Sequence, residues 1–463
     1  MDGTHASQEP PLANAPTPAA PLSGAERRRA MRRSWINAIP ACAYETPVHR
    51  MPTPFGPLFI VSDPEGVRRV LVDGAEDFPK HAIHLTVTRL VFGAGLLSSE
   101  GAAWRAHRRI MSPAFDPRAV ASYGPAIEAA LARLLADWDA LPAGAEIDIG
   151  EAMMGLGLRV ISTTMFSADG EAMMETAGRA MQAALAIRPS FLDLLPGIGV
   201  LRRGGNARRV AGMFAELDAG VHRLVAERRA AGEAAPSDLL GRLIAARDPQ
   251  TGEALTAREI RDQVVTIFLA GHETTAVALT WVWYVLSQRP AIEARLLAEL
   301  DAALQGRAAT QADLPRLPFA RALAQEVMRL YPPVPNLLAR RATRTEVVAG
   351  VRIPRGAMVA VTPWIVHRHR ALWADPERFD PARFLDGAPP HPRLAYIPFG
   401  AGPRTCIGMR LALAEIVTAL ATIAPRYRLA LAPGQPIELQ HRATLRPVGG
   451  LRMAISRRCP RDL

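Results

Sequence analysis

The stretch that decides the fold is Phe399-Gly400-Ala401-Gly402-Pro403-Arg404-Thr405-Cys406-Ile407-Gly408, followed by a helical pattern from Met409 to about Ala424. Its glycines let the backbone turn tightly and come close to a flat group. Backbone amides freed by such a turn can point toward a sulfur at the start of a helix. Arg404 adds a fixed cation suited to a carboxylate. The segment therefore predicts a stabilised thiolate at Cys406.

The longest predicted helix begins with a capping box, in which Thr256 and Glu259 satisfy the first free amides, and runs to about Ser287. Its length is about 48 Å at about 1.5 Å per residue, so a helix this apolar is expected to cross the protein interior. The centre of the helix reads Ala270-Gly271-His272-Glu273-Thr274-Thr275. Glycine and threonine weaken or bend a helix, so their place at the middle of a buried one indicates a functional requirement.

Another predicted helix begins near Pro318, ends before Pro332 and carries Glu326 and Arg329 on one face. Alone, this pair would usually be a solvated surface pair. It is followed by Pro376-Glu377-Arg378-Phe379, a second arginine-bearing segment.

Trp104 and Arg108 are i, i+4 neighbours on a third predicted helix. Without further context this helix would be interpreted as a solvated basic surface.

Taken together, these motifs resemble the cytochrome P450 family. The cysteine segment matches the family pattern F-G-x-G-x-R-x-C-x-G at every specified position, and W-x-x-x-R, A-G-x-E-T and E-x-x-R precede it in the family's order. The resemblance covers about residues 40 to 455. Two other interpretations of the segment are a plain buried cysteine and a nucleotide-binding loop. The loop is disfavoured because Gly400-Ala401-Gly402 lacks the third glycine of a dinucleotide fingerprint, and no Lys-Ser/Thr of a phosphate loop follows.

The resemblance implies a mainly α fold with a small β-rich region, in which haem lies between the long central helix and the cysteine-loop helix. It implies that the cofactor is haem b (iron protoporphyrin IX) and that Cys406 ligates its iron. It also implies cofactor contacts for a further set of residues, which are Phe399, Gly402, Arg404, Gly408, Trp104, Arg108 and Arg340. The adjacent Arg341 leaves the register at Arg340 open.

At the long helix, the resemblance implies that Ala270 and Gly271 leave room over the haem. It also implies that Thr274 and Glu273 are catalytic, with Thr274 donating a hydrogen bond and Glu273 delivering protons during oxygen activation. We interpret His272 as a satisfied helix histidine. For the E-x-x-R region, the resemblance implies that Glu326, Arg329 and Arg378 form a buried ionic network holding the cysteine loop.

The implied activity is that of a soluble, bacterial-type monooxygenase, which inserts one oxygen atom from O2 into a hydrophobic small molecule by hydroxylation or epoxidation. Two alternatives stay open, a haem-thiolate sensor or carrier without turnover and a haem-thiolate isomerase or dehydratase. The variable, largely apolar segments expected to line the substrate site are residues 81–99, 183–201 and 334–338. They permit fatty acids, terpenoids, carotenoids or aromatics.

The charge and composition of the chain limit the classes of binding partner that we expect. The chain has a formal net charge of +11, and Lys80 is its only lysine, but no compact basic run with interleaved aromatics marks a nucleic-acid binder. Arg105, Arg109 and Arg410 lie close in sequence to predicted haem contacts. They predict a basic face for an acidic ferredoxin or flavodoxin, which its reductase would supply with electrons.

Other features set the expected organisation. Three cysteines are too few and too scattered for a disulfide framework, and no stretch reaches the roughly 18 apolar residues of a membrane span or resembles an export signal. We therefore expect a cytoplasmic protein with a disordered Pro/Ala-rich tail over residues 1–25. Residues 26–463 are expected to form a single catalytic domain without a fused reductase. Residues 56–72 predict a strand, turn and short helix, and residues 350–362 a hairpin turning at Pro354-Arg355-Gly356.

Overall fold

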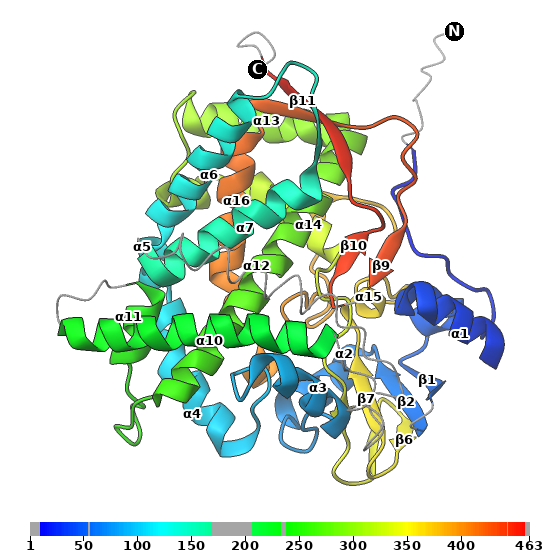
Figure 1. Cartoon of the computed structure of the whole chain (residues 1–463). Helices are drawn as coiled ribbons and strands as arrows, with labels where there is room; N and C mark the ends of the chain where they lie inside the picture. Colours follow the sequence, from blue (N-terminus) through cyan, green and yellow to red (C-terminus); the bar gives the residue numbers. More distant parts are fainter. Residues whose placement is uncertain (1–9, 54–55, 168–205, 233–237, 442, 459–463) are drawn as a thin grey trace, which may run out of the picture. The chain divides into compact units, whose positions relative to one another are not determined.

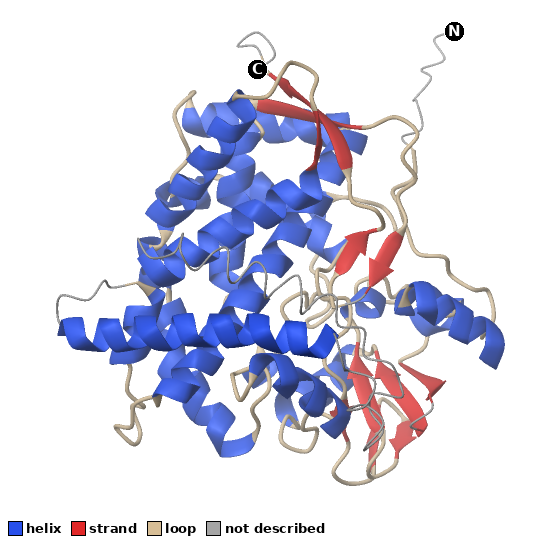
Figure 2. Cartoon of the chain, in the orientation of Figure 1, coloured by secondary structure: helices blue, strands red, loops and turns tan. Residues whose placement is uncertain are grey.

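A computed structural model describes residues 10–53, 56–167, 206–232, 238–441 and 443–458. The described chain is mainly helical with short strands gathered in small sheets, as the sequence predicts (Figure 1 and Figure 2). It divides into two compact units. The first comprises residues 1–81, 131–154 and 274–463, and the second residues 82–130 and 155–273.

The helices vary widely in length. The α-helices are α1 (Gly24–Arg33), α2 (Pro64–Arg68), α3 (Ala82–Phe92), α4 (Gly101–Met111), α5 (Pro117–Ser122), α6 (Gly124–Asp139), α7 (Ile149–Phe166), α10 (Asn206–Ala231), α11 (Leu239–Ala245), α12 (Ala257–Gln288), α13 (Pro290–Leu304), α14 (Pro318–Leu330), α15 (Pro363–Val366) and α16 (Met409–Ile423). Shorter helical turns are η1 (Trp35–Ala38), η2 (Ala41–Tyr44), η3 (Arg69–Asp73), η4 (Ser112–Phe115), η8 (Gln311–Arg316), η9 (Pro381–Phe384) and η10 (Gly402–Arg404).

The predicted long helix is α12, and its capping box is present. The Glu259 amide donates to the Thr256 hydroxyl (3.2 Å), while the Thr256 amide donates to the Glu259 carboxylate (2.9 Å). Pro290 does not only end α12 but also begins α13, where a proline's missing N–H costs nothing. Among the described residues, α12 is the one helix long and apolar enough to cross a bilayer. However, 83% of its apolar window is buried inside the protein, as expected of a core helix.

Buried polar side chains attach both ends of α12 to their own unit. In the second unit, Asp262 accepts a hydrogen bond from the Ala94 amide (2.7 Å), and Gln263 accepts one from the Leu96 amide (2.8 Å). In the first unit, the Trp281 indole donates to the Leu445 carbonyl (2.7 Å). These bonds fix the rotation of the helix about its axis.

The strands of the described residues form four small sheets. Their bounds are β1 (Val48–Thr53), β2 (Gly56–Val61), β3 (Glu146–Asp148), β4 (Arg340–Arg341), β5 (Glu346–Val348), β6 (Val351–Ile353), β7 (Met358–Val361), β8 (Tyr427–Leu431), β9 (Leu439–His441), β10 (Leu445–Pro447) and β11 (Arg452–Arg457). The largest sheet has the order β1-β2-β7-β4, with β2 and β7 parallel. The others are β3-β11-β8, β9-β10 and β5-β6. The strand, turn and short helix predicted over residues 56–72 are confirmed by β2, α2 and η3.

The predicted hairpin over residues 350–362 is wrong in its pairing, although both of its strands exist. β6 pairs with β5, in the register Val348↔Val351, and β7 joins the four-stranded sheet instead. The hairpin turn lies at Ala349 (φ +47°) and Gly350 (φ +78°), two consecutive residues with positive φ. Such a turn matches the twist of paired strands, whereas the segment at Pro354 only carries the chain from one sheet to the next.

The N-terminal segment also differs in part from the expected disorder. The Ala13 amide donates to the Tyr284 hydroxyl (2.8 Å), and the Tyr331 hydroxyl donates to the Ala13 carbonyl (2.7 Å). Further along, the Pro18 carbonyl accepts from the Ala41 amide (2.8 Å). The disorder expected for residues 1–25 therefore does not extend over residues 13–18, whereas residues 1–9 lie outside the described chain.

One apolar core connects the four-stranded sheet to the cysteine segment. Phe59 and Val359 from the sheet belong to the same buried cluster as Ile397 and Ala401. The predicted loop around Cys406 is thus packed on one side against a folded sheet rather than suspended in solvent.

Candidate active site

The cysteine loop is closed by its own backbone hydrogen bonds. The Cys406 amide donates to the Phe399 carbonyl (2.9 Å), and the Thr405 amide donates to the Gly402 carbonyl (3.0 Å). The loop ends at Gly408, which caps the N-terminus of α16. Within this tight frame, the Cys406 side chain is exposed. The structure therefore places the Cys406 sulfur just before a helix N-terminus, a position that favours a thiolate.

Glycine is required at Gly402 for two reasons. Its φ of +71° lies in the left-handed region, and a Cβ there would lie 2.0 Å from the Leu71 carbonyl oxygen of η3. The same argument does not apply to Gly408, because a Cβ there would lie 4.0 Å from the Cys406 sulfur, an ordinary van der Waals contact. Gly402 therefore seats the loop against η3.

Glu326 and Arg329 of α14 form a fully buried ion pair, both with 0% exposure. The Arg329 guanidinium donates to both carboxylate oxygens of Glu326 (2.7 and 2.8 Å). Its remaining N–H groups donate to the carbonyls of His367, Pro376 and Arg378 (2.9, 2.6 and 3.0 Å). The predicted pair is therefore confirmed, and it binds the backbone of the segment that precedes the cysteine loop.

The third member of the network is not the one predicted. Arg378 takes part through its backbone carbonyl, and its side chain is exposed. The guanidinium that approaches Glu326 is that of Arg383, whose Nε lies 3.6 Å from Oε1. The sequence held a signal for this, because Pro381-Ala382-Arg383-Phe384 repeats the pattern of Pro376-Glu377-Arg378-Phe379 five residues later.

The centre of α12 has an accessible face within an otherwise buried helix. Ala270 is exposed, and Gly271 and Thr274 are partly exposed, whereas the residues from Asp262 to Leu269 are buried. Positions i, i+1 and i+4 lie on one side of a helix. The three residues predicted to face the reacting groups therefore share one open strip.

The neighbouring residues of that motif are buried. Glu273 is 6% exposed and His272 is 3% exposed. A Cβ on Gly157 of α7 would lie 2.8 Å from the His272 carbonyl oxygen, so the two helices approach closely at this point. The His272 ring lies 6.4 Å from that of Phe268. These are the surroundings of a packed core histidine.

On α4, the predicted haem contacts Trp104 and Arg108 are both partly exposed on one side of the helix. Of the arginines predicted to form a basic docking face, Arg105 and Arg410 are exposed. Arg109 is instead held by both carboxylate oxygens of Asp248 (3.0 and 2.6 Å). The Asp248 side chain is only 2% exposed, so its buried charge needs a cation. Arg109 therefore does not offer the docking charge that the sequence predicted.

The strand β4 carries both arginines between which the sequence left the cofactor contact open, Arg340 and Arg341. Arg340 is buried at 8% exposure, and Arg341 is exposed because successive residues of a strand point to opposite faces. This arrangement favours Arg340 over Arg341 as the inward-facing cation.

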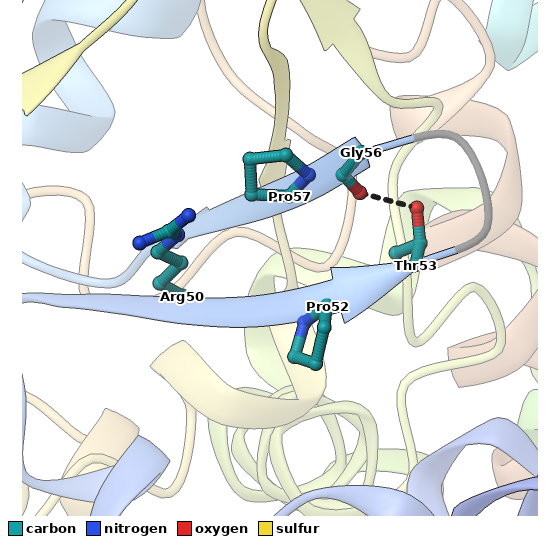
Figure 3. Close-up of a pocket in the computed structure, with 5 residues that line it drawn as sticks. All are labelled: Arg50, Pro52, Thr53, Gly56 and Pro57. Atoms are coloured by element: carbon teal, nitrogen blue, oxygen red, sulfur yellow. Dashed lines mark hydrogen bonds between the residues drawn. The ribbon is translucent and has the colours of Figure 1, made fainter. Parts of the chain in front are cut away.

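The predicted substrate-lining segments are only partly described. Residues 81–99 contain α3, and residues 334–338 form a partly buried loop, whereas residues 183–201 lie outside the described chain. Figure 3 shows a hollow elsewhere, on the β1–β2 hairpin, lined by Arg50, Pro52, Thr53, Gly56 and Pro57. There the Thr53 hydroxyl donates to the Gly56 carbonyl (2.6 Å), and none of the predicted site residues is present.

One buried ionisable group on α16 was not anticipated. Glu415 is 5% exposed, and desolvation raises its pKa to about 8, so that the neutral form is favoured at pH 7. Its position within an apolar helical pattern gave no sign that the carboxyl would face the interior.

The residues present fit a thiolate-ligated haem. The first unit offers an accessible sulfur at a helix N-terminus, with Arg404 two residues before it and the inward-facing Arg340 as cations for propionates. The same donor set would not suit a bare metal ion. Among the described residues, no three His, Cys, Asp or Glu side chains gather in a way that could hold one.

Comparison with known proteins identifies relatives across nearly the whole chain. The family model described as Cytochrome P450 matches residues 43–451. Cyclooctatin synthase of Streptomyces melanosporofaciens is 35% identical over 86% of each chain. Pentalenene oxygenase of Streptomyces avermitilis is 33% identical, over 87% of this chain and 88% of its own. The solved heme domain of cytochrome P450DA matches with a TM-score of 0.79 and 28% identity, over 90% of this chain and 91% of its own.

A glycine-to-alanine pair tests the seating of the cysteine loop. Gly402 (φ +71°) and Gly434 (φ +72°) have the same backbone conformation, but a Cβ on Gly434 would meet nothing within 4 Å. Gly434→Ala should therefore cost only the strain of the left-handed region, about 1–2 kcal/mol. Gly402→Ala should cost more and should also lower the haem bound per protein, measured with thermal unfolding on the same samples. Equal losses of stability in both variants, with haem content unchanged, would contradict this account.

A second pair tests the corrected ionic network. Arg383→Ala removes a cation beside buried Glu326 and should lower the free energy of unfolding by about 1–3 kcal/mol. Arg378→Ala keeps the carbonyl that Arg329 uses and removes only an exposed side chain, so its effect should stay within about 0.5 kcal/mol. Denaturant unfolding of both variants distinguishes them. The opposite order would restore Arg378 as the third ionic partner.

Proposed function

The chain belongs to the cytochrome P450 family, and from that premise we propose that it hydroxylates or epoxidises a hydrophobic terpenoid, with electrons from a separate redox protein. The protein is an oxidoreductase of the monooxygenase type, and its cofactor is haem b. The exposed sulfur at Cys406, held in a closed loop before α16, is the observation that carries the proposal.

Bound haem supplies the activation of O2, from which one oxygen atom enters the substrate and the other leaves as water. The chain's own residues hold the cofactor and control protons. Cys406 would give its thiolate to the iron, with Phe399, Gly402 and Gly408 shaping the loop that presents it. Arg404 and Arg340 would bind the propionates, as would Trp104 and Arg108 on α4.

The open strip of α12 suits the reacting side of the cofactor. Ala270 and Gly271 present little side chain there, which leaves space for oxygen and substrate. The hydroxyl of the partly exposed Thr274 would donate a hydrogen bond to the reacting oxygen, and the buried Glu273, the preceding residue in the sequence, would supply the proton that follows. Burial of Glu273 shields its own carboxyl from bulk water.

The names of relatives support a terpenoid substrate. Cyclooctat-9-en-7-ol 5-monooxygenase of Streptomyces melanosporofaciens is 36% identical over 81% of each chain, and a pentalenene oxygenase is also among the relatives. The apolar composition of residues 81–99 and 334–338 fits such a substrate. We further propose a cytoplasmic location, since the apolar helix α12 is used in the core.

A haem-thiolate carrier without turnover is the main alternative. The intact Glu273-Thr274 pair argues against it, since a carrier needs no proton delivery.

Coupling of oxygen use to product tests the proposed roles. A terpenoid that gives a spectral shift on binding is supplied with electrons from a surrogate ferredoxin system, and O2 uptake, product and hydrogen peroxide are measured. Thr274→Ala should divert roughly tenfold more of the oxygen consumed to hydrogen peroxide. Thr275→Ala, one residue further along the helix and buried, is the matched control. Wild-type protein that binds terpenoids but consumes no oxygen would support the carrier, and unchanged coupling in Thr274→Ala would remove Thr274 from the proton path.

Charge reversal tests the proposed redox partner. We propose that an acidic ferredoxin or flavodoxin, itself reduced by its reductase, uses the exposed Arg105 and Arg410. Arg105→Glu and Arg410→Glu should each raise the KM for such a donor on the order of tenfold at low salt, with less effect as salt rises. Arg428→Glu, an exposed reversal on β8, is the control. Rates that respond to neither salt nor these substitutions would count against an electrostatic partner.

A further inference from the structure

His367 is a buried histidine to which the proposed function assigns no role. It follows α15 directly and is 0% exposed. It lies 38 residues after Arg329 and 30 before Ile397 in sequence, yet it hydrogen-bonds to both. The residue therefore joins α14 to the segment that leads into the cysteine loop.

The two ring nitrogens have opposite duties. Nδ1 lies 3.1 Å from the Arg329 carbonyl oxygen, which can only accept, so Nδ1 carries the proton. Nε2 is then left as the acceptor for the Ile397 amide, at 2.9 Å. Desolvation, aided by the charge of Arg329, lowers the pKa of His367 to about 3, so the ring stays neutral. A single tautomer satisfies both bonds.

The same residue is attached to α14 a second time. Its backbone carbonyl accepts a hydrogen bond from the Arg329 guanidinium (2.9 Å). The ring also stacks on Tyr396 at 5.4 Å, and the Tyr396 hydroxyl donates to the Gln325 carbonyl (3.0 Å). The consecutive residues Tyr396 and Ile397 are therefore both connected to α14, Tyr396 directly and Ile397 through His367.

Ile397 is where the cysteine loop begins. Its carbonyl accepts a hydrogen bond from the Gly400 amide (3.0 Å), and the Phe399 carbonyl accepts from the Cys406 amide (2.9 Å). A continuous chain of bonds thus leads from the buried ion pair through His367 and Ile397 to the loop that carries the sulfur.

We propose that His367 is a positioning residue, whose Nε2 fixes the Ile397 amide and thereby holds the Cys406 sulfur in place toward the haem iron. This inference rests on the proposed role of Cys406 as iron ligand. The proposal concerns a specific hydrogen bond rather than packing volume. Loss of the bond at Nε2 should therefore have a different effect from loss of the bond at Nδ1.

Two substitutions separate these bonds. His367→Gln can place its side-chain oxygen near the Nε2 position and keep the bond to Ile397, while it gives up the bond to Arg329. His367→Asn does the reverse, because its amide nitrogen can donate from near the Nδ1 position. His369→Asn is the matched control, a buried histidine at 4% exposure whose ring bonds to the Thr46 carbonyl (3.3 Å).

The experiment follows the ferrous carbonyl adduct of each haem-loaded protein, together with its reduction potential. The rate at which the red-shifted, thiolate-ligated absorption converts to the shorter-wavelength form should rise roughly tenfold in His367→Asn. In His367→Gln and His369→Asn the rate should stay within about twofold of wild type. The reduction potential should change in His367→Asn alone.

Each outcome decides the matter. Equal conversion rates in the asparagine and glutamine variants, or no change in either, would overturn the proposal and leave His367 a packing residue. If His367→Asn yields no folded protein, His367→Gln still decides. A carbonyl adduct of His367→Gln that converts faster than that of His369→Asn would overturn the proposal. Equal conversion rates in these two variants would support it. A wild-type adduct without red-shifted absorption would instead refute the role of Cys406.

Discussion

The buried ion pair of Glu326 and Arg329 is the interaction on which the rest of the structure depends. Removing two charges from water is costly, and such a pair is stable only when every remaining hydrogen-bonding group is satisfied. Here the other N–H groups of Arg329 find three backbone carbonyls, and the Asp380 amide donates to Glu326 (2.8 Å). Movement of the segment around residues 367–380 would therefore take hydrogen-bond partners away from the buried charges. Removing one partner of a buried ion pair costs about 3–5 kcal/mol.

Two parts of the proposed site are not covered by other parts of the chain, the side chain of Cys406 and the strip at the middle of α12. Fixed contacts support the first: Gly402 seats the loop against Leu71, and the ion pair anchors the chain that precedes it. Rigid support of an exposed ligand is what a metal-bound cofactor requires.

The sequence was informative where the chemistry is local. Caps, helix periods and glycine positions predicted α12, α14 and the cysteine loop, because each depends on residues within a few positions of one another. It failed where the interacting residues are far apart in sequence or where two segments have similar sequences. The pairing of β6 with β5 depended on positive φ at Ala349, and the choice of Arg383 over Arg378 depended on which of two similar segments reaches Glu326. The pairing of Arg109 with Asp248 joins residues 139 apart in sequence.

The most direct test of the account asks whether the sulfur of residue 406 is bonded to iron. Cys42 and Cys459 are replaced by serine, which leaves Cys406 as the sole cysteine, and the protein is produced with cysteine labelled by the heavy sulfur isotope. Resonance Raman spectra of the ferric protein should then show an iron–sulfur stretching band that moves to lower frequency relative to unlabelled protein. A haem-loaded, folded protein whose spectrum contains no isotope-sensitive band would contradict thiolate ligation by Cys406.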